Sequence, residues 1–426
     1  MDIAYLFVML FGMIVFGIPV AIALAGSSAV YVLISGSVPS MVVAHRMING
    51  VDSFPLLAVP FFILAGNLMN TAGITERVFD FAKALIGWMR GGLGHVNIGS
   101  SVIFAGMSGA AVADAGGLGA IEIKAMRDAN YDPGFAVGIT AASSTIGPII
   151  PPSLPMVIYG VVAGASIGQL FAAGFIPGLL MALALSLMVA WFARRRGFKR
   201  DQAFHWPTLG RTFMKAFLSL MTPVIIVGGI LSGAFTPTEA AIAACAWAMV
   251  LGLLVYRTLT WPRFVRVSID TIETTAVVLF VVAAASIFAW ILTSNRVPEH
   301  FASAILAISE NPWIVLILIN LILLIVGCFM ETVAAITILV PVLLPIAVKI
   351  GVDPVHFGVI MVLNLMLGLL TPPVGMVLYV LARVAKIPFE RCVVSTAPFL
   401  IPLVIVLMMV TFIPSLTMWL PTLLYR

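Results

Sequence analysis

Prolines in the middle of two apolar stretches are the residues with the clearest chemical consequence in this chain. The stretches cover residues 138–164 and 359–386, and the prolines are Pro148, Pro151, Pro152, Pro372 and Pro373. Proline has no N–H, so each one leaves the carbonyl four residues earlier without its helical donor. In a membrane, such carbonyls are tolerated where they line a protein-enclosed cavity, and there they commonly hold a cation. The two breaks therefore predict a transport site.

The two breaks belong to an internal repeat. Residues 132–152 align without a gap on 353–373, so that an Asp-Pro pair, a glycine and a Pro-Pro pair coincide. Upstream, Gly106 and Gly327 each lie 45 residues before the first proline of the pair. Matches of these residue types at equal spacing are not expected from composition alone, so the chain is predicted to contain two copies of one unit.

Composition sets the class of protein. The 426 residues are 62% hydrophobic and 9% charged, with a mean hydropathy of +1.18. These values predict an all-α polytopic membrane protein without a soluble domain. The three cysteines match no metal or redox spacing. The N-terminal stretch lacks a basic region and a small-residue cleavage site, so we expect a retained first span.

Hydropathy and the repeat divide the chain into elements. The first repeat, 1–193, is predicted to hold scaffold helices in 1–92, a re-entrant hairpin and the broken helix at about 93–166, and a span at 168–192. Within that scaffold, spans are expected at about 3–17, 19–36 and 53–71, with an interfacial helix at about 74–90. A basic cytoplasmic linker is expected at 194–216. The second repeat, 217–426, is predicted to hold scaffold 217–310, hairpin and broken helix at about 311–387, and a last span at 391–412.

The charges support an inverted arrangement. A re-entrant hairpin does not change sides, so each repeat crosses the membrane an odd number of times and the second repeat is inverted. If the linker is cytoplasmic, most other lysines and arginines fall on the same side, as the positive-inside rule requires. The exceptions are Arg46, Arg296, Lys349 and Arg426. Both termini are then expected to be periplasmic.

Each repeat offers a hairpin tip opposite a broken helix, and this pairing predicts two sodium sites. Sodium is a hard cation, and freed carbonyls and hydroxyls supply oxygen ligands without a buried charge. The first site is predicted from Gly106, Ser108, Gly147, Ile150 and Ser153. The second is predicted from Gly327, Gly368, Thr371 and Val374.

An anionic substrate is expected between these sites, held by helix N-termini and by hydroxyl or amide groups. The candidates are Ser108, Ser143, Ser144, Thr145, Thr332 and Asn364. The alternative for each is a packing residue bonded to backbone. Asp114, Glu239 and Glu331 are the acids nearest the membrane interior, and for each of them a hydrogen bond to a helix end stands beside ion coupling. Arg383 is expected to cap a helix at the cytoplasmic interface, with substrate contact as the alternative.

Six motifs carry a family resemblance. They are GMSGAAVAD at 106–114, IGPIIPPS at 146–153, FTPTEAA at 235–241, GCFME at 327–331, DPVHFG at 353–358 and TPPVG at 371–375. Over essentially its full length the chain resembles the large membrane subunit (M subunit, DctM-like) of tripartite ATP-independent periplasmic (TRAP) transporters.

The resemblance implies a sodium-coupled importer of the bacterial inner membrane with an elevator-type transport domain and no organic cofactor. It also implies a small membrane subunit, a soluble periplasmic binding protein and a small organic anion, such as a carboxylate or sugar acid, as cargo. The fold is similar to that of divalent-anion/sodium symporters, so a stand-alone symporter is the alternative. We expect no enzyme activity.

One motif in the chain resembles a catalytic site. Gly106-Met-Ser-Gly109 matches the GxSG of intramembrane serine proteases, but an activated serine needs a base within hydrogen-bond reach. All five histidines fall in predicted loops or at segment ends. The protease is therefore a remote alternative.

Overall fold

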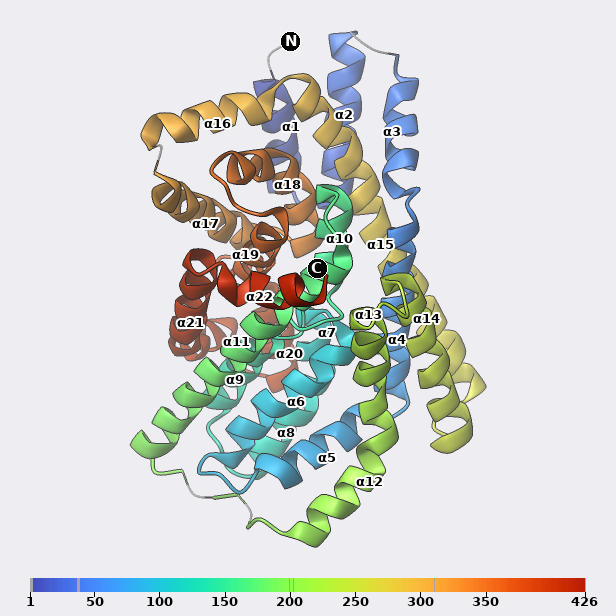
Figure 1. Cartoon of the computed structure of the whole chain (residues 1–426), viewed down its shortest axis with the longest axis vertical. Coiled ribbons are helices and arrows are strands. Elements are labelled where there is room, and N and C mark those ends of the chain that lie inside the picture. Colours follow the sequence, from blue (N-terminus) through green and yellow to red (C-terminus); the bar gives the residue numbers. More distant parts are fainter. Residues whose placement is uncertain (1–2, 37–38, 199, 202, 310, 426) are drawn as a thin grey trace.

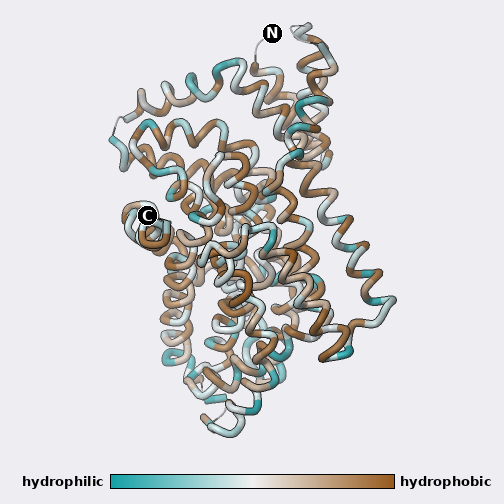
Figure 2. Tube along the Cα trace, turned by 45° about the vertical axis from the view of Figure 1, so that its right-hand side comes forward, coloured by the Kyte–Doolittle hydropathy of each residue, from teal (hydrophilic) through white to brown (hydrophobic). Residues whose placement is uncertain are grey.

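The structure is a computed structural model of the 426-residue chain, and it describes all residues except 1–2, 37–38, 199, 202, 310 and 426. The described residues form helices joined by short loops (Figure 1). Eight of the described helices are long and apolar enough to cross a membrane. Figure 2 shows apolar residues along most helices and polar residues mainly near their ends. The prediction of an all-α polytopic membrane protein is confirmed.

The first half of the chain contains scaffold helices, a hairpin and a broken helix, in that order. The scaffold helices come first: α1 (Ala4–Val15), α2 (Val20–Ser35), α3 (Met41–Val51), η1 (Phe54–Leu57), α4 (Ala58–Thr71) and α5 (Ile74–Ile86). The hairpin is α6 (Gly92–Ser108), the short tip helix α7 (Ala111–Gly116) and α8 (Leu118–Asp128). The broken helix is α9 (Pro133–Ser144) and α10 (Leu154–Ala163), and α11 (Ile167–Arg195) follows.

The second half repeats this order. Its scaffold is α12 (Trp206–Pro223), η2 (Val224–Gly228), α13 (Gly229–Leu231), α14 (Pro237–Val250), η3 (Leu251–Val255), α15 (Trp261–Ser294) and α16 (Val297–Ile308). The second hairpin is α17 (Pro312–Phe329) and α18 (Thr332–Lys349), and the second broken helix is α19 (Pro354–Gly368) and α20 (Met376–Ala385). The chain ends with α21 (Phe389–Phe412) and α22 (Ser415–Leu424).

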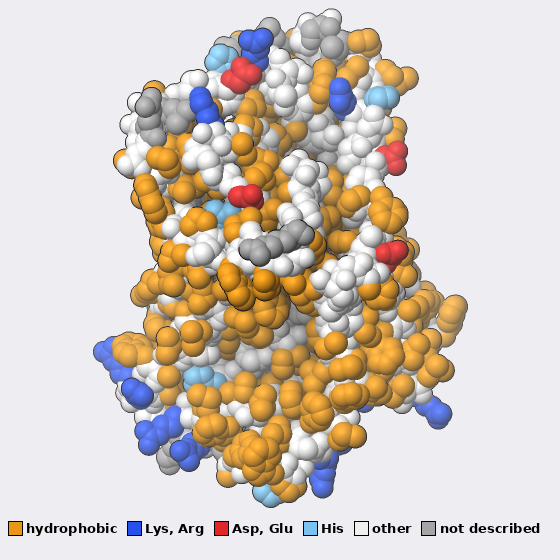
Figure 3. Space-filling model, in the orientation of Figure 1, with side chains coloured by type: hydrophobic (Ala, Val, Ile, Leu, Met, Phe, Trp, Pro, Cys, Tyr) orange, Lys and Arg blue, Asp and Glu red, His pale blue; other side chains and the backbone are white. Residues whose placement is uncertain are grey.

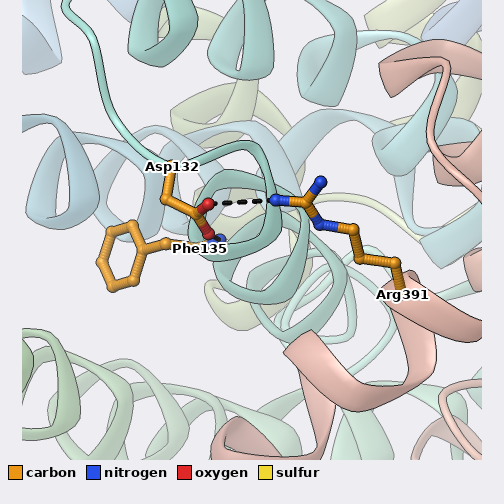
Figure 4. A network of polar contacts seen from close by, with 3 residues as sticks. All are labelled: Asp132, Phe135 and Arg391. Atoms are coloured by element: carbon orange, nitrogen blue, oxygen red, sulfur yellow. Dashed lines mark hydrogen bonds and ion pairs between the residues drawn. The ribbon is translucent and has the colours of Figure 1, made fainter.

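The two Asp-Pro pairs of the repeat begin the two broken helices. Asp132 Oδ2 accepts the N–H of Phe135 at 2.9 Å, and Asp353 Oδ1 accepts the N–H of Val355 at 2.7 Å. Each proline stands in the first turn, where its missing N–H costs nothing. Asp132 also pairs with Arg391 of α21 at 3.2 Å (Figure 4). The same local sequence therefore starts the same element in both halves.

The two hairpins enter from opposite ends of the molecule. Figure 1 shows α6 and α8 in the lower half and α17 and α18 in the upper half, with the breaks of both broken helices between them. On the face in Figure 3, lysines and arginines gather at the lower end, and a few more lie at the upper end. A largely apolar belt separates the two ends. The halves are thus inverted relative to each other.

Three helical segments differ from the sequence expectations. Helix α3 was not predicted, because His45, Arg46 and Asn49 lower its hydropathy below that of a span. Its Gly50 lies close against Ser286 of α15, and this packing supports the helix. Residues 206–216 of the expected linker are the first turns of α12, and α22 follows the expected last span.

Candidate functional site

In the second repeat, the hairpin tip lies directly on the break of the broken helix. A Cβ added to Gly368 would lie 2.5 to 2.7 Å from the backbone C, Cα and O atoms of Gly327. The N–H of Val374 donates to the carbonyl of Cys328 at 3.3 Å. The Thr371 hydroxyl donates to the carbonyl of Gly368 at 2.9 Å. The structure therefore brings together all four residues of the second predicted sodium site.

The first repeat has a similar junction, but a different glycine makes it. The N–H of Leu154 donates to the carbonyl of Gly109 at 3.3 Å. Gly109 has a φ of +64°, and a Cβ on it would collide with the carbonyl oxygen of Pro152. Gly106, which was predicted at this position, lies instead against Pro223 of α12. Met107 and Ser108, the last two residues of α6, separate Gly106 from the contact that Gly109 makes. The role of Gly106 as a sodium ligand stays a prediction.

The other residues of the first predicted site lie at the break itself. Gly147 faces the buried carboxylate of Asp114 from the tip helix α7. Ser153 caps α10, accepting the N–H of Met156 at 3.2 Å, and its hydroxyl donates to the carbonyl of Pro148. Ile150 is buried and its side chain packs against Gly178 of α11. The side chain of Ser108 lies outside the described part of the structure, although its backbone ends α6.

Some of the freed carbonyls already have protein donors. Pro148 O accepts from Ser153, and Gly368 O accepts from both the N–H and the hydroxyl of Thr371, at 3.1 and 2.9 Å. A carbonyl oxygen has two lone pairs, and a hydroxyl that donates still has acceptor capacity. Both junctions therefore gather neutral oxygen atoms, and the first also has the buried Asp114 carboxylate beside Gly147. Oxygen atoms of these kinds suit an alkali cation. No group of three or more His, Cys, Asp or Glu side chains that could hold a metal occurs within the described residues.

The predicted substrate residues are buried, and most bond to protein. Ser143 Oγ donates to Asn97 Oδ1 of α6 at 2.6 Å, and Asn97 donates to Thr140 Oγ1 at 2.7 Å. Ser144 and Thr145 donate to carbonyls of their own helix turn. Ser143 thus joins the broken helix to the first arm of its hairpin. For these three residues the hydrogen bonds favour the alternative that they are packing residues and do not bind substrate.

The repeat places Asn364 at the position of Ser143, and it makes the equivalent connection. Asn364 Nδ2 donates to the backbone carbonyl and to Oδ1 of Asn320 on α17, at 2.9 and 2.7 Å. Its own Oδ1 is buried and has no hydrogen-bond partner among the described residues. Thr332 is buried at the start of α18. Asn364 therefore keeps an acceptor for an ion or a ligand.

Glu331, Glu239 and Arg383 lie at the ends of helices. Glu331 caps α18 by accepting the N–H groups of Val333 and Ala334, at 2.9 and 3.2 Å. Glu239 forms a capping box with Thr236 at the start of α14. Arg383 is exposed in the last turn of α20. For Glu239 and Glu331 the structure supports the helix-end reading.

Several polar residues at the site were missed from the sequence. Asn97 and Asn320 lie on apolar hairpin arms, and Glu122 of α8 is fully enclosed, accepting the Ser100 hydroxyl at 2.6 Å. The sequence feature that could have identified them is an amide or carboxylate inside an otherwise apolar segment. Burying such a group costs free energy unless it is hydrogen-bonded. Bonding partners from another helix, however, cannot be read from spacing.

A small cavity lies beside the first hairpin tip. It has a volume of about 170 Å³ and is enclosed by α4, α6, α7, α10 and α15. Its lining residues are Phe62, Ile63, Gly66, Asn67, Asn70, Phe104, Ala110, Ala113, Leu154 and Thr274. Tip and break residues thus face polar groups of the scaffold helices across this space. Asn67 and Asn70 were also missed, although two amides at i and i+3 in a span were a usable signal.

Comparison with known proteins identifies the family. The family model for the DctM component of tripartite ATP-independent periplasmic transporters matches residues 7–416. The chain belongs to the DctM family. It is 50% identical over 412 residues to the sialic acid TRAP transporter large permease protein SiaM of Vibrio cholerae, covering 97% of this chain and 96% of that protein.

Other relatives of this DctM-family chain differ in cargo and length. It is 39% identical to the 2,3-diketo-L-gulonate TRAP transporter large permease protein YiaN of Escherichia coli, covering 96% of each. It is 43% identical to the sialic acid TRAP transporter permease protein SiaT of Haemophilus influenzae, but spans only 62% of that protein. The crystal structure of the Alcanivorax borkumensis YdaH transporter is similar in fold, with a TM-score of 0.62 over 86% of each chain at 14% identity.

Proposed function

We propose that this DctM-family chain is the large membrane subunit of a sodium-coupled importer for a small organic anion. The observation that carries the proposal is the pair of junctions at Gly327–Gly368 and Gly109–Pro152, where a hairpin tip meets freed carbonyls in each inverted half. Each junction collects carbonyl and hydroxyl oxygens, and at the first junction the buried carboxylate of Asp114 also faces the break. Sodium, the proposed coupling ion, is a hard cation that such oxygens can coordinate.

The cargo anion is a carboxylate or sugar acid. The relative at 50% identity is named for sialic acid, and another at 39% for 2,3-diketo-L-gulonate. We place the anion near the cavity beside Asn67 and Asn70, where the first hairpin tip faces the scaffold. Inward movement of one net positive charge with the anion gains about 2.3 kcal/mol per 100 mV of membrane potential. Sodium and the potential therefore drive accumulation without ATP.

Transport proceeds by movement of one block against another. The mobile block consists of both hairpins and both broken helices, from α6 to α10 and from α17 to α20. The static scaffold consists of the helices that precede each hairpin. The hydrogen bonds from Ser143 to Asn97 and from Asn364 to Asn320 tie each broken helix to its hairpin, so each pair can move as one body.

The subunit works with a small membrane subunit and a soluble periplasmic binding protein in the bacterial inner membrane, with both of its termini periplasmic. The lengths of two relatives support the additional membrane part: the chain spans 62% of SiaT and 64% of the isethionate TRAP transporter permease protein DctMQ of Oleidesulfovibrio alaskensis. The remaining third of each relative is long enough to contain the small subunit.

Reconstitution tests the proposal. Vesicles containing the chain and its small subunit are loaded with potassium buffer and placed in sodium buffer with labelled sialic acid, with or without a binding protein. We expect uptake only when both the sodium gradient and the binding protein are present. Uptake by the membrane part alone would instead favour the stand-alone symporter, and uptake without sodium would contradict the coupling.

A further inference from the structure

A second, larger space lies away from the hairpin tips, between α3 and α15 on one side and α10 and α18 on the other. Its volume is about 470 Å³, within the range of small-molecule pockets. Its lining residues are Arg46, Asn49, Gly50, Ser53, Val161, Val162, Val282, Ala285, Ser286, Ala289, Trp290, Thr293, Thr337 and Pro341. We call this space the outer cavity. Arg46 lies on the side that we propose to be periplasmic.

Among the described residues, Arg46 is the only charged one that lines the outer cavity. Its guanidinium carbon lies 5.2 Å from the centre of the Trp290 ring. Stacking on an indole orients a guanidinium and leaves its edge N–H groups available for a forked pair with a carboxylate. In the described part of the chain Arg46 forms no ion pair with an acidic side chain. The cation is therefore oriented and lacks an anion.

Neutral donors surround this cation. Ser53, Ser286 and Trp290 line the cavity, and their side-chain donors make no hydrogen bond with any described residue. Thr337 already donates to the carbonyl of Val333 at 3.0 Å, so it offers only acceptor capacity. Valine, alanine and proline side chains cover the remaining wall. A space with one cation, several free donors and an apolar wall suits a small organic acid and disfavours a cation.

We propose that the outer cavity is an anion-binding site in which Arg46 holds the carboxylate of the cargo before it reaches the hairpin tips. This inference rests on the proposed importer function, since it assigns a second position to the same class of substrate. The cavity walls come from the scaffold on one side and from the proposed mobile block on the other. The site is thus complete only in the arrangement seen here, and movement of the block opens it.

A neighbouring space supports an access route. A cavity of about 550 Å³ shares Ser53 and Val161 with the outer cavity and continues between η1, α14 and the loop from α10 to α11. Within the described part of the chain, its lining adds the polar residues Ser166, Thr236 and Thr238 and no charged residue. Arg46 is consequently the one charged residue among the described residues that line the combined space, and it is the electrostatic anchor for an entering anion.

Direct binding tests this site without relying on transport. The purified chain in sodium-free buffer is titrated with sialic acid and, separately, with succinate, while tryptophan emission is followed. We expect a saturable change in tryptophan emission for at least one of the two probes. This change should be lost in Trp290→Phe. Arg46→Gln should weaken apparent affinity by about tenfold or more, because a charge-assisted forked hydrogen bond is removed. Arg46→Lys should lie between Arg46→Gln and the wild type.

The matched control is Arg296→Gln, an exposed arginine just beyond the end of α15 that does not line the cavity. Its affinity should equal that of the wild type, and melting temperatures should agree among the variants. Equal affinities of Arg46→Gln and the wild type, or no saturable response to either probe in the wild type, would overturn the site. Failure of sodium-driven uptake in vesicles, with anion binding still dependent on Arg46, would instead overturn the importer function.

Discussion

At the scale of single residues, backbone contact decides the two junctions. Gly368 meets the main chain of Gly327, and Gly109 meets the carbonyl of Pro152, so neither position has room for a side chain. Backbone atoms cannot move aside as a flexible side chain can. The close approach places backbone carbonyls of the hairpin tip beside those of the break, which is the geometry that the proposed sodium sites require.

Gly368→Ala should separate the second hairpin tip from the break. Overpacking of this kind costs about 1–3 kcal/mol, and the displaced oxygens should reduce sodium-driven uptake by at least about tenfold. Uptake assays and thermal melting check both effects. Gly210→Ala is the control, because a Cβ at that position in α12 meets nothing within 4 Å. Normal uptake and a normal apparent sodium affinity in Gly368→Ala would contradict the site.

Ser143→Ala should destabilise the protein without changing substrate affinity. The variant lacks the hydroxyl that donates to the buried Asn97 Oδ1. Leaving a buried acceptor without a donor costs about 1–3 kcal/mol of folding free energy. Ser144→Ala is a matched control in the same turn, because among the described residues the Ser144 side chain bonds only to its own helix. Its replacement should change the melting temperature little. A rise in the apparent KM for the anion at unchanged melting temperature would show instead that Ser143 contacts the substrate.

At the scale of elements, the repeated Asp-Pro start is more important than the single ion pair attached to it. Asp132 caps α9, and it also pairs with Arg391 while the two side chains remain 45% and 51% exposed. An exposed pair contributes about 0–1 kcal/mol, whereas a helix cap typically contributes about 1 kcal/mol. The cap therefore accounts for most of the stabilisation at this position.

Asp132→Ala should accordingly lower the stability of the protein more than Arg391→Ala. The first variant loses the cap and the pair together, and the second loses only the pair. Thermal melting in detergent at low and high salt measures the difference, and only the contribution of the pair should shrink with added salt. Equal losses in both variants would show that the pair, and not the cap, matters here.

At the scale of the whole molecule, the transport mechanism that we propose divides the chain into a mobile block and a static scaffold with an interface between them. The outer cavity lies in that interface, with α3 and α15 facing α10 and α18. Figure 1 shows α10 between the upper hairpin helices and the long helix α15. Relative movement of the bodies must change the distances across this cavity.

Cross-linking across the cavity should therefore stop transport. After the native cysteines are replaced by alanine, Val162→Cys and Ala289→Cys place one thiol on α10 and one on α15. A short bifunctional thiol reagent should abolish sodium-driven uptake, and a cleavable reagent should restore it on reduction. Asn49→Cys with Ala289→Cys joins α3 to α15 within the scaffold and serves as the control. Undiminished uptake with the first pair fully linked would rule out movement between these helices.

The sequence alone determined the class, the repeat and the positions of both breaks, because proline removes a backbone donor wherever it stands and hydropathy is a local property. Tertiary structure decided the contacts: Gly109 rather than Gly106 at the first junction, the bonds from Asn97 and Asn320, and the place of Arg46 on a helix too polar to be recognised as a span. These depend on how helices distant in the chain pack together. Residue spacing along one segment contains no information about which atoms another segment brings to it.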